Sequence, residues 1–109
     1  MLNKQVTFTV GLTTRRGTSL HPARVIAGVS QALAELGLDG FTVTEHTGYW
    51  KGEPERSLSF IVIYDSAGFV GFDPAGIASR LATTFDQDAV LYAIHGVFAE
   101  LIGQRGDVA

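Results

Sequence analysis

The segment Thr47 to Ser57 holds the densest group of side chains in this sequence that could do chemistry. It contains the only tryptophan, Trp50, next to Tyr49, and two carboxylates, Glu53 and Glu55. Side chains of this kind can bind and orient a small ligand, and functional residues often gather on loops held by a rigid scaffold. The alternative is a hairpin whose aromatic residues cover a sheet edge while its charged residues stay solvated.

Two further polar groups lie outside this segment. The triplet Asp86-Gln87-Asp88 falls between the second predicted helix and the last predicted strand, where it either ends the helix or meets a ligand at that sheet edge. The pair Arg15-Arg16 falls in a turn, where it either meets an anionic ligand or partner or is simply solvated.

Several kinds of catalytic site have no support in the sequence. The three histidines, His21, His46 and His95, form no spacing with a carboxylate that indicates a metal triad, so no metal is expected. His21 stands beside a helix start, where a capping or surface role is expected. No serine lies in a nucleophile elbow, and there is no cysteine to act as a nucleophile or thiolate ligand. The glycine-rich stretch from Gly68 to Gly76 lacks the lysine of a phosphate-binding loop.

Length and composition describe one globular domain that spans residues 1–109. The chain is 46% hydrophobic and 17% charged, and its formal net charge is -3. Nucleic-acid binding is not expected, because it calls for clustered Lys and Arg. No apolar run approaches the length of a membrane span, and the N-terminus leads directly into a strand pattern, so we expect neither a membrane segment nor a signal peptide. The absence of cysteine agrees with a cytoplasmic location.

Hydrophobic periodicity predicts the elements that must position these side chains. Alternation over residues 5–13 indicates a strand with one face on a core. An amphipathic helix follows Pro22, with Ser19 or Thr18 as its cap and Gly37 at its C-terminal end. The other predicted elements are strands at 41–46 and 58–64, a loop with exposed aromatics at 66–72, a helix after Asp73-Pro74, a strand at 89–94 and a short strand at 97–102. The core is expected over about 5–102, followed by a polar tail at 103–109.

The order of these elements predicts an α+β fold. A sequence of strand, helix, strand, strand, helix and strand fits a ferredoxin-like βαββαβ sandwich, with both helices on one face of a single sheet. The run Phe60 to Ile63 predicts a central strand covered on both faces. The sheet face without helices and the apolar stretch Val97 to Ile102 favour a homo-oligomer.

Four short motifs occur in a characteristic order. They are Gly37-Leu38-Asp39-Gly40, Thr47-Gly48-Tyr49-Trp50-Lys51, Glu55-Arg56-Ser57 and Asp86-Gln87-Asp88-Ala89-Val90-Leu91. Together they resemble, over residues 6–94, the S-adenosylmethionine (SAM) degrading enzymes of T-odd-type bacteriophages, long called SAM hydrolases and now read as SAM lyases. Part of the pattern also resembles an uncharacterised bacterial domain family of similar topology.

The resemblance to the SAM lyases implies a PII-like homotrimer with its ligand between subunits. It implies a tyrosine shortly after the Thr-Gly pair and a glutamate that opens the next strand. Tyr49 and Glu55 are the nearest matches, and they are assigned as catalytic residues. Trp50 stands where the family has its tyrosine, and Glu53 is a rival to Glu55, so both are assigned with Gln87 to substrate binding.

The implied reaction needs no cofactor. The carboxylate of SAM attacks its own γ-carbon, methylthioadenosine leaves as a neutral thioether, and homoserine lactone forms. Aromatic rings such as Tyr49 and Trp50 would hold the sulfonium, and Glu55 would anchor the ammonium. The implied setting is the cytoplasm of the host cell, with the host's SAM synthetase as a further candidate partner.

Two other functions compete with the lyase. One is a non-catalytic PII-like trimer that binds or sequesters a nucleotide-like ligand at its subunit interfaces. The other is a structural or partner-binding protein that uses its sheet face only for assembly.

Overall fold

The fold is a four-stranded sheet with two helices packed on it. In the computed structural model, residues 1–104 are described, so most of the predicted polar tail at 103–109 lies outside the described residues. The elements are β1 (Leu2–Gly11), α1 (Pro22–Ala34), β2 (Thr42–Trp50), β3 (Glu53–Tyr64), the short 3-10 helix η1 (Ser66–Phe69), α2 (Pro74–Thr84) and β4 (Leu91–Ala99).

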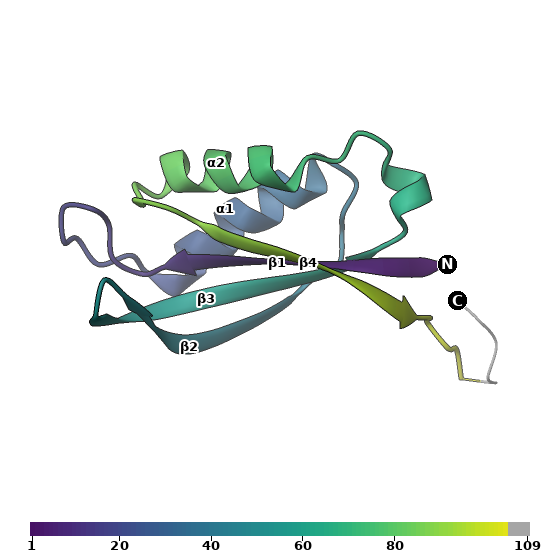
Figure 1. Cartoon of the computed structure of the whole chain (residues 1–109), viewed down its shortest axis with the longest axis horizontal. Helices are drawn as coiled ribbons and strands as arrows, with labels where there is room; N and C mark the ends of the chain where they lie inside the picture. Colours follow the sequence, from purple (N-terminus) through teal and green to yellow (C-terminus); the bar gives the residue numbers. More distant parts are fainter. Residues whose placement is uncertain (105–109) are drawn as a thin grey trace.

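The strand order confirms the predicted ferredoxin-like α+β arrangement. The sheet runs β2-β3-β1-β4 with antiparallel neighbours throughout. Both helices cover the same face of the sheet, and no helix within residues 1–104 lies on the opposite face (Figure 1). Over the described range, no helix is long and apolar enough to cross a membrane.

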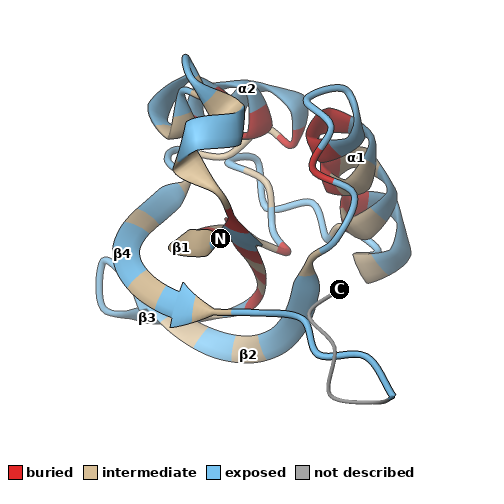
Figure 2. Cartoon of the chain, turned by 90° about the vertical axis from the view of Figure 1, so that its right-hand side faces the viewer, coloured by how far each residue is buried: buried red, intermediate tan, exposed pale blue. Residues whose placement is uncertain are grey.

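The core lies between the helices and the inward face of the sheet. Phe8 of β1 and Phe60 of β3 are fully buried, and they face each other in the strand register. Helix α1 contributes Val25, Val29 and Leu33 to this core. Most buried residues lie on these facing surfaces of helix and sheet (Figure 2), and Ser57 is a buried residue on the other face of the sheet.

The ends of α1 show one correct and one wrong prediction. Gly37 has φ +78°, and its N–H donates to the carbonyl of Ala34, which confirms the glycine as the C-terminal stop. The N-terminal cap is His21 rather than Ser19 or Thr18. Its Nδ1 accepts a hydrogen bond from the N–H of Ala23 at 3.1 Å, so the imidazole satisfies a free helix donor.

The segment Thr47 to Ser57 is not a loop but the end of a long hairpin. Strands β2 and β3 extend to a closing pair between Trp50 and Glu53. Lys51 and Gly52 make the turn with φ of 53° and 80°, and two positive φ values suit the right-handed twist of the flanking strands. The strands predicted at 41–46 and 58–64 were therefore too short, because turn-prone residue types hid their ends.

Three smaller predictions were also wrong. The strand at 89–94 and the short strand at 97–102 are one element, β4, which ends at Ala99. Only one face of the central strand is covered in this chain, since Phe60 is buried whereas Ile63 is 41% exposed. The aromatics of the loop at 66–72 are partly buried, because Phe69 and Phe72 pack against Tyr64.

An ion pair joins the two helices at the surface. Arg80 of α2 donates to Glu35, the C-terminal cap residue of α1, over 2.8 Å. This hydrogen bond and the charge of Arg80 lower the pKa of the Glu35 carboxyl, and the reverse interaction raises the pKa of Arg80.

Candidate ligand-binding cavity

We call the sheet face opposite the two helices the open face. One end of this open face carries a cavity of about 720 Å³. The tip of the β2–β3 hairpin, the turn after β1 and the segment between α2 and β4 surround it. Its lining residues are Thr9, Gly11, Thr13, Thr14, Arg15, His46, Gly48, Tyr49, Trp50, Glu55, Ser57, Gln87, Asp88, Ala89, Val90 and Leu91. A cavity of this size suits a small-molecule ligand.

The strand register decides which hairpin side chains face the cavity floor. Glu55 stands opposite Gly48, and residues directly opposite in an antiparallel pair share one face of the sheet. Trp50, two residues after Gly48, returns to that same face. Tyr49 belongs to the opposite face and reaches the cavity only at its rim, where it is 76% exposed.

The Glu55 carboxylate is partly buried and lies above the backbone of Gly11. A Cβ placed on Gly11 would lie 1.8 Å from Glu55 Oε1, so this glycine leaves the space that the carboxylate occupies. Among residues 1–104 the carboxylate makes no ion pair and accepts no hydrogen bond. A carboxylate in this state can accept a charge-assisted hydrogen bond from a cationic ligand.

Near Glu55, a hydrogen-bonded row of three polar side chains, Thr9, Ser59 and His46, spans three neighbouring strands. Thr9 of β1 and His46 of β2 both contact the hydroxyl of Ser59 on β3, at 2.9 Å from Thr9 Oγ1 and 2.6 Å from His46 Nε2. Thr9 and His46 line the cavity, and so does Ser57. This network holds neighbouring strands in register at the cavity floor.

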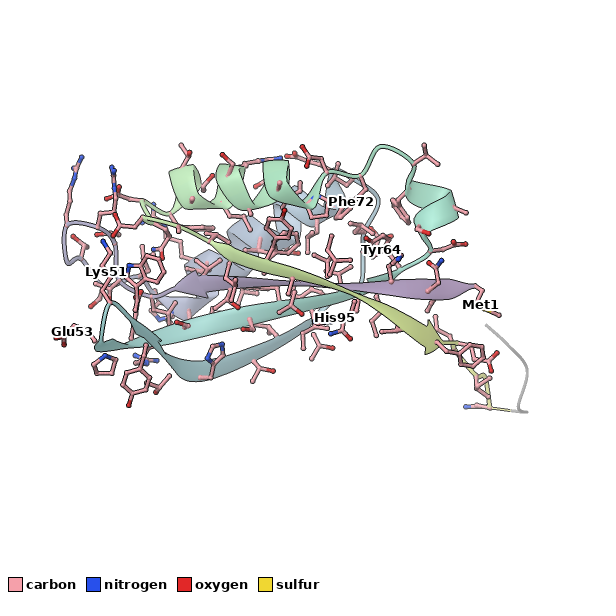
Figure 3. All side chains as sticks on the ribbon, viewed as in Figure 1. Met1, Lys51, Glu53, Tyr64, Phe72 and His95 are labelled. Carbon is pink, nitrogen blue, oxygen red and sulfur yellow. The ribbon has the colours of Figure 1, made fainter. Side chains whose placement is uncertain are left out.

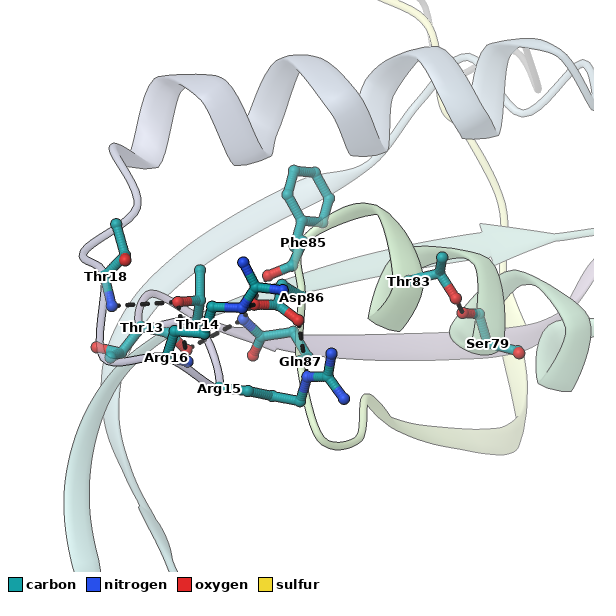
Figure 4. Close-up of polar contacts among 10 residues, drawn as sticks. All are labelled: Thr13, Thr14, Arg15, Arg16, Thr18, Ser79, Thr83, Phe85, Asp86 and Gln87. Carbon is teal, nitrogen blue, oxygen red and sulfur yellow. Dashed lines mark hydrogen bonds and ion pairs between the residues drawn. The ribbon is translucent and has the colours of Figure 1, made fainter.

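Charged side chains surround the cavity mouth. Arg15 donates through Nε to Asp86 Oδ1 at 2.7 Å, and its backbone N–H donates to the Asp86 carbonyl at 2.8 Å (Figure 4). At the hairpin tip, Lys51 Nζ lies 4.0 Å from Asp88 Oδ2 and pairs with this carboxylate. The lining therefore holds two carboxylates, Glu55 and Asp88, and one guanidinium that is already paired.

Four of the five predicted site residues line this cavity: Tyr49, Trp50, Glu55 and Gln87. Glu53 does not line it, and its exposed side chain lies at the end of the hairpin (Figure 3). Sequence reasoning missed the open-face residues Thr9, His46 and Ser57. The alternation of the strands was the available signal, because it places these residues on the face of Glu55.

Gln87 lies at the cavity with its amide already engaged. Its Oε1 accepts from the N–H of Gly11 at 3.1 Å, and its Nε2 donates to the carbonyls of Thr13 and Phe85 at 3.2 and 3.1 Å. Both amide hydrogens are thereby used by the backbone.

The described residues offer no metal centre. Within residues 1–104, no three His, Cys, Asp or Glu side chains gather in a way that could hold a metal ion. The side chains that line the cavity can position a ligand, pair with its charges and exclude water.

Solved structures with the same fold include phage SAM lyases. One, a phage SAM lyase in complex with S-methyl-5'-thioadenosine, aligns with a TM-score of 0.68 at 18% identity, covering 97% of this chain and 84% of the other. A phage SAM lyase in the apo state aligns with a TM-score of 0.70 at 21% identity, covering 99% and 85%. At these identities the likeness shows a shared fold.

The fold also occurs in a DUF3240 family protein from Shewanella baltica OS155. It aligns with a TM-score of 0.60 at 15% identity, covering 95% of this chain and 100% of the other. No protein-family model matches the chain. No curated protein matches it either.

Proposed function

We propose that this protein is a SAM lyase that converts S-adenosylmethionine to methylthioadenosine and L-homoserine lactone. The observation that carries the proposal is the partly buried carboxylate of Glu55, which has no ionic or hydrogen-bond partner among residues 1–104 and shares its sheet face and its cavity with Trp50. The fold common to this chain and the phage SAM lyases supports it.

The proposed reaction is an intramolecular displacement. The carboxylate oxygen of the methionine moiety forms a bond to its own γ-carbon. The bond from that carbon to sulfur breaks, and its electron pair stays on the sulfur. The leaving group is a neutral thioether and the nucleophile is already ionised, so neither a general acid nor a general base is needed. Holding the chain in attack geometry can supply up to about 7–11 kcal/mol.

The charges of the cavity fit this substrate. SAM carries a sulfonium, an ammonium and one carboxylate, so its net charge is positive. Glu55 can anchor the ammonium, and Trp50 can face the sulfonium. The apolar side chains of Val90 and Leu91 can cover the purine ring. Anionic nucleotides fit this lining less well, because Glu55 repels them and the nearby cations Arg15 and Lys51 are paired with Asp86 and Asp88.

Incubation of the purified protein with SAM tests the proposal. We expect methylthioadenosine and homoserine lactone in equal amounts, with no added metal and no effect of a chelator. Rapid quenching and mass spectrometry identify the first product. Homoserine formed ahead of its lactone would mean that water is the nucleophile and would contradict the mechanism.

If SAM is bound but not consumed, the protein is a binding module instead of an enzyme. A thermal shift with SAM, compared with ATP as an anionic nucleotide, reports such binding, since a ligand that binds only the folded state raises stability. No shift with either compound would favour the structural or partner-binding alternative.

The aromatic that faces the sulfonium is proposed to be Trp50. It shares the face of Glu55, whereas Tyr49 lies on the other face of β2. Trp50 is 49% exposed, and a cation–π contact at an exposed site is worth up to about 1 kcal/mol, so Trp50→Leu should lower kcat/KM for SAM about fivefold. Tyr49→Phe should change it by less than about threefold, since a rim hydroxyl in solvent contributes little. A larger loss from Tyr49→Phe than from Trp50→Leu would reverse the assignment.

The trimer is also a proposal. Strand β4 and the residues after it expose apolar side chains that a second copy of the chain would cover: Leu91, Phe98, Leu101 and Ile102. Large exposed apolar patches mark association surfaces. Light scattering at micromolar concentration should give three times the chain mass, and Phe98→Glu should lower it to one. A monomer mass for the unmodified protein would reject this interface.

The setting of the activity is part of the same proposal. A phage-encoded SAM lyase would act in the cytoplasm of the host cell, where its substrate is made. Contact with the host's SAM synthetase would be a separate protein interaction, and pull-down with that purified enzyme would test it directly.

A further inference from the structure

We infer that Gly11 and Gln87 act together as positioning residues for the Glu55 carboxylate. The inference rests on the proposed role of Glu55 in holding the substrate ammonium. A Cβ on Gly11 would lie 1.8 Å from Glu55 Oε1 and 2.8 Å from Gln87 Oε1, so the ends of both side chains lie over this glycine, and Gln87 holds the glycine through the hydrogen bond from its N–H.

The side chain of Gln87 hydrogen-bonds to the part of β1 and the residues after it that β4 does not reach. Strand β4 pairs with β1 only as far as Leu91, which stands opposite Thr9. Two residues further along β1, the Gly11 N–H donates to Gln87 Oε1, and beyond it Gln87 Nε2 donates to the carbonyl of Thr13. A side-chain amide has the donor and acceptor of a peptide group, so Gln87 continues the sheet by one step beyond the start of β4.

The second amide hydrogen of Gln87 ties this edge to the end of α2. It is donated to the carbonyl of Phe85 (Figure 4), and the backbone N–H of Gln87 donates to the carbonyl of Ala82 at 2.8 Å. Asp86, between them, has φ +50°, a conformation that turns the chain back toward β1. The floor of the cavity is thereby fixed to the helix by one side chain.

Gly11 is needed for space and not for backbone conformation. It is absent from the glycines of positive φ in the described chain. The group that a methyl at this position would approach most closely is the end of the flexible Glu55 side chain, whereas Gln87 Oε1, at the larger distance, is held by its hydrogen bonds. Alanine at position 11 should therefore be accommodated by displacing the Glu55 carboxylate, with the fold intact.

The first test is Gly11→Ala, with Gly40→Ala as the matched control. A Cβ on Gly40 would meet no heavy atom within 4 Å, and Gly40 has no positive φ. We expect Gly11→Ala to lower kcat/KM for SAM about a hundredfold, the effect of displacing a reacting geometry by about 1 Å. In a Glu55→Ala background Gly11→Ala should have a much smaller effect, because only the close approach to Gln87 Oε1 remains. Equal activity of Gly11→Ala and Gly40→Ala would overturn the inference.

The second test does not depend on turnover. The carboxyl ¹³C chemical shift of Glu55, measured by NMR at one fixed neutral pH, should change in Gly11→Ala and in Gln87→Leu and stay the same in Gly40→Ala, because only the first two variants alter the surroundings of this carboxylate. If SAM is not consumed by the unmodified protein, the proposed function fails, while a changed Glu55 chemical shift still supports the positioning role. An unchanged chemical shift in both variants would refute that role whatever the activity.

Discussion

Replacement of Glu55 by glutamine is expected to lower kcat/KM for SAM at least about a hundredfold. Glutamine keeps the size of the side chain and one carbonyl acceptor, so the space above Gly11 stays filled. It loses the charge that anchors the ammonium, and a hydrogen bond to a charged group contributes about 1.5–3 kcal/mol. A less tightly held methionine chain also spends less time in its reactive conformation, so the turnover number should fall as well.

The matched control for this prediction is Glu53→Gln. It makes the same chemical change two residues away, on an exposed side chain outside the cavity lining. Activity should stay within about twofold of the unmodified protein, since an exposed charge is worth little. Light scattering checks that both variants keep the same assembly. Loss of turnover in Glu53→Gln with normal turnover in Glu55→Gln would show that the functional glutamate was assigned two residues too late.

The sequence was sufficient to predict the fold. Most of the side chains predicted from it as site residues also line the cavity. Strand alternation and helical spacing are local patterns, and they were strong in residues such as Val6, Phe8 and Val29, which are fully buried. The hairpin from Thr47 to Ser57 was harder. Its glycines, proline and charges are typical of loops, but the pairing partner across the turn keeps the chain extended, and that partner is visible only in the folded chain.

Local sequence patterns could not predict which residues from distant segments of the chain come together at the site. Gly11 and Gln87 are 76 positions apart in the chain, and nothing near either one predicts the hydrogen bond between them. The space over Gly11 that the Glu55 carboxylate occupies lies beside a part of β1 that β4 does not reach, because β4 begins at Leu91, opposite Thr9. Choosing between Tyr49 and Trp50 likewise needed the register of the hairpin, because adjacent residues of a strand point to opposite faces.

The core and the cavity meet at Phe85, which makes this residue a test of how the site is supported. Its ring is buried between the helices, where a Cβ on Gly28 of α1 would lie 2.6 Å from the ring carbon Cζ. Its carbonyl accepts the hydrogen bond from Gln87 at the cavity floor. The side chain thus anchors the end of α2 to α1, and the backbone of the same residue fixes Gln87.

Phe85→Ala is expected to lower the free energy of unfolding by about 3–5 kcal/mol, since it removes a buried ring and leaves a cavity that the two helices cannot fully close. Phe85→Leu should cost less, because it keeps much of the volume. Urea unfolding at one fixed protein concentration measures both changes as shifts of the midpoint at constant slope. Val70→Ala removes an apolar side chain that is 90% exposed and should stay within about 0.5 kcal/mol of the unmodified protein. Equal stability of Phe85→Ala and Val70→Ala would show that the end of α2 is held by its backbone contacts and not by this ring. The link between α2 and the cavity floor would then depend on the hydrogen bonds of Gln87 and not on the Phe85 ring.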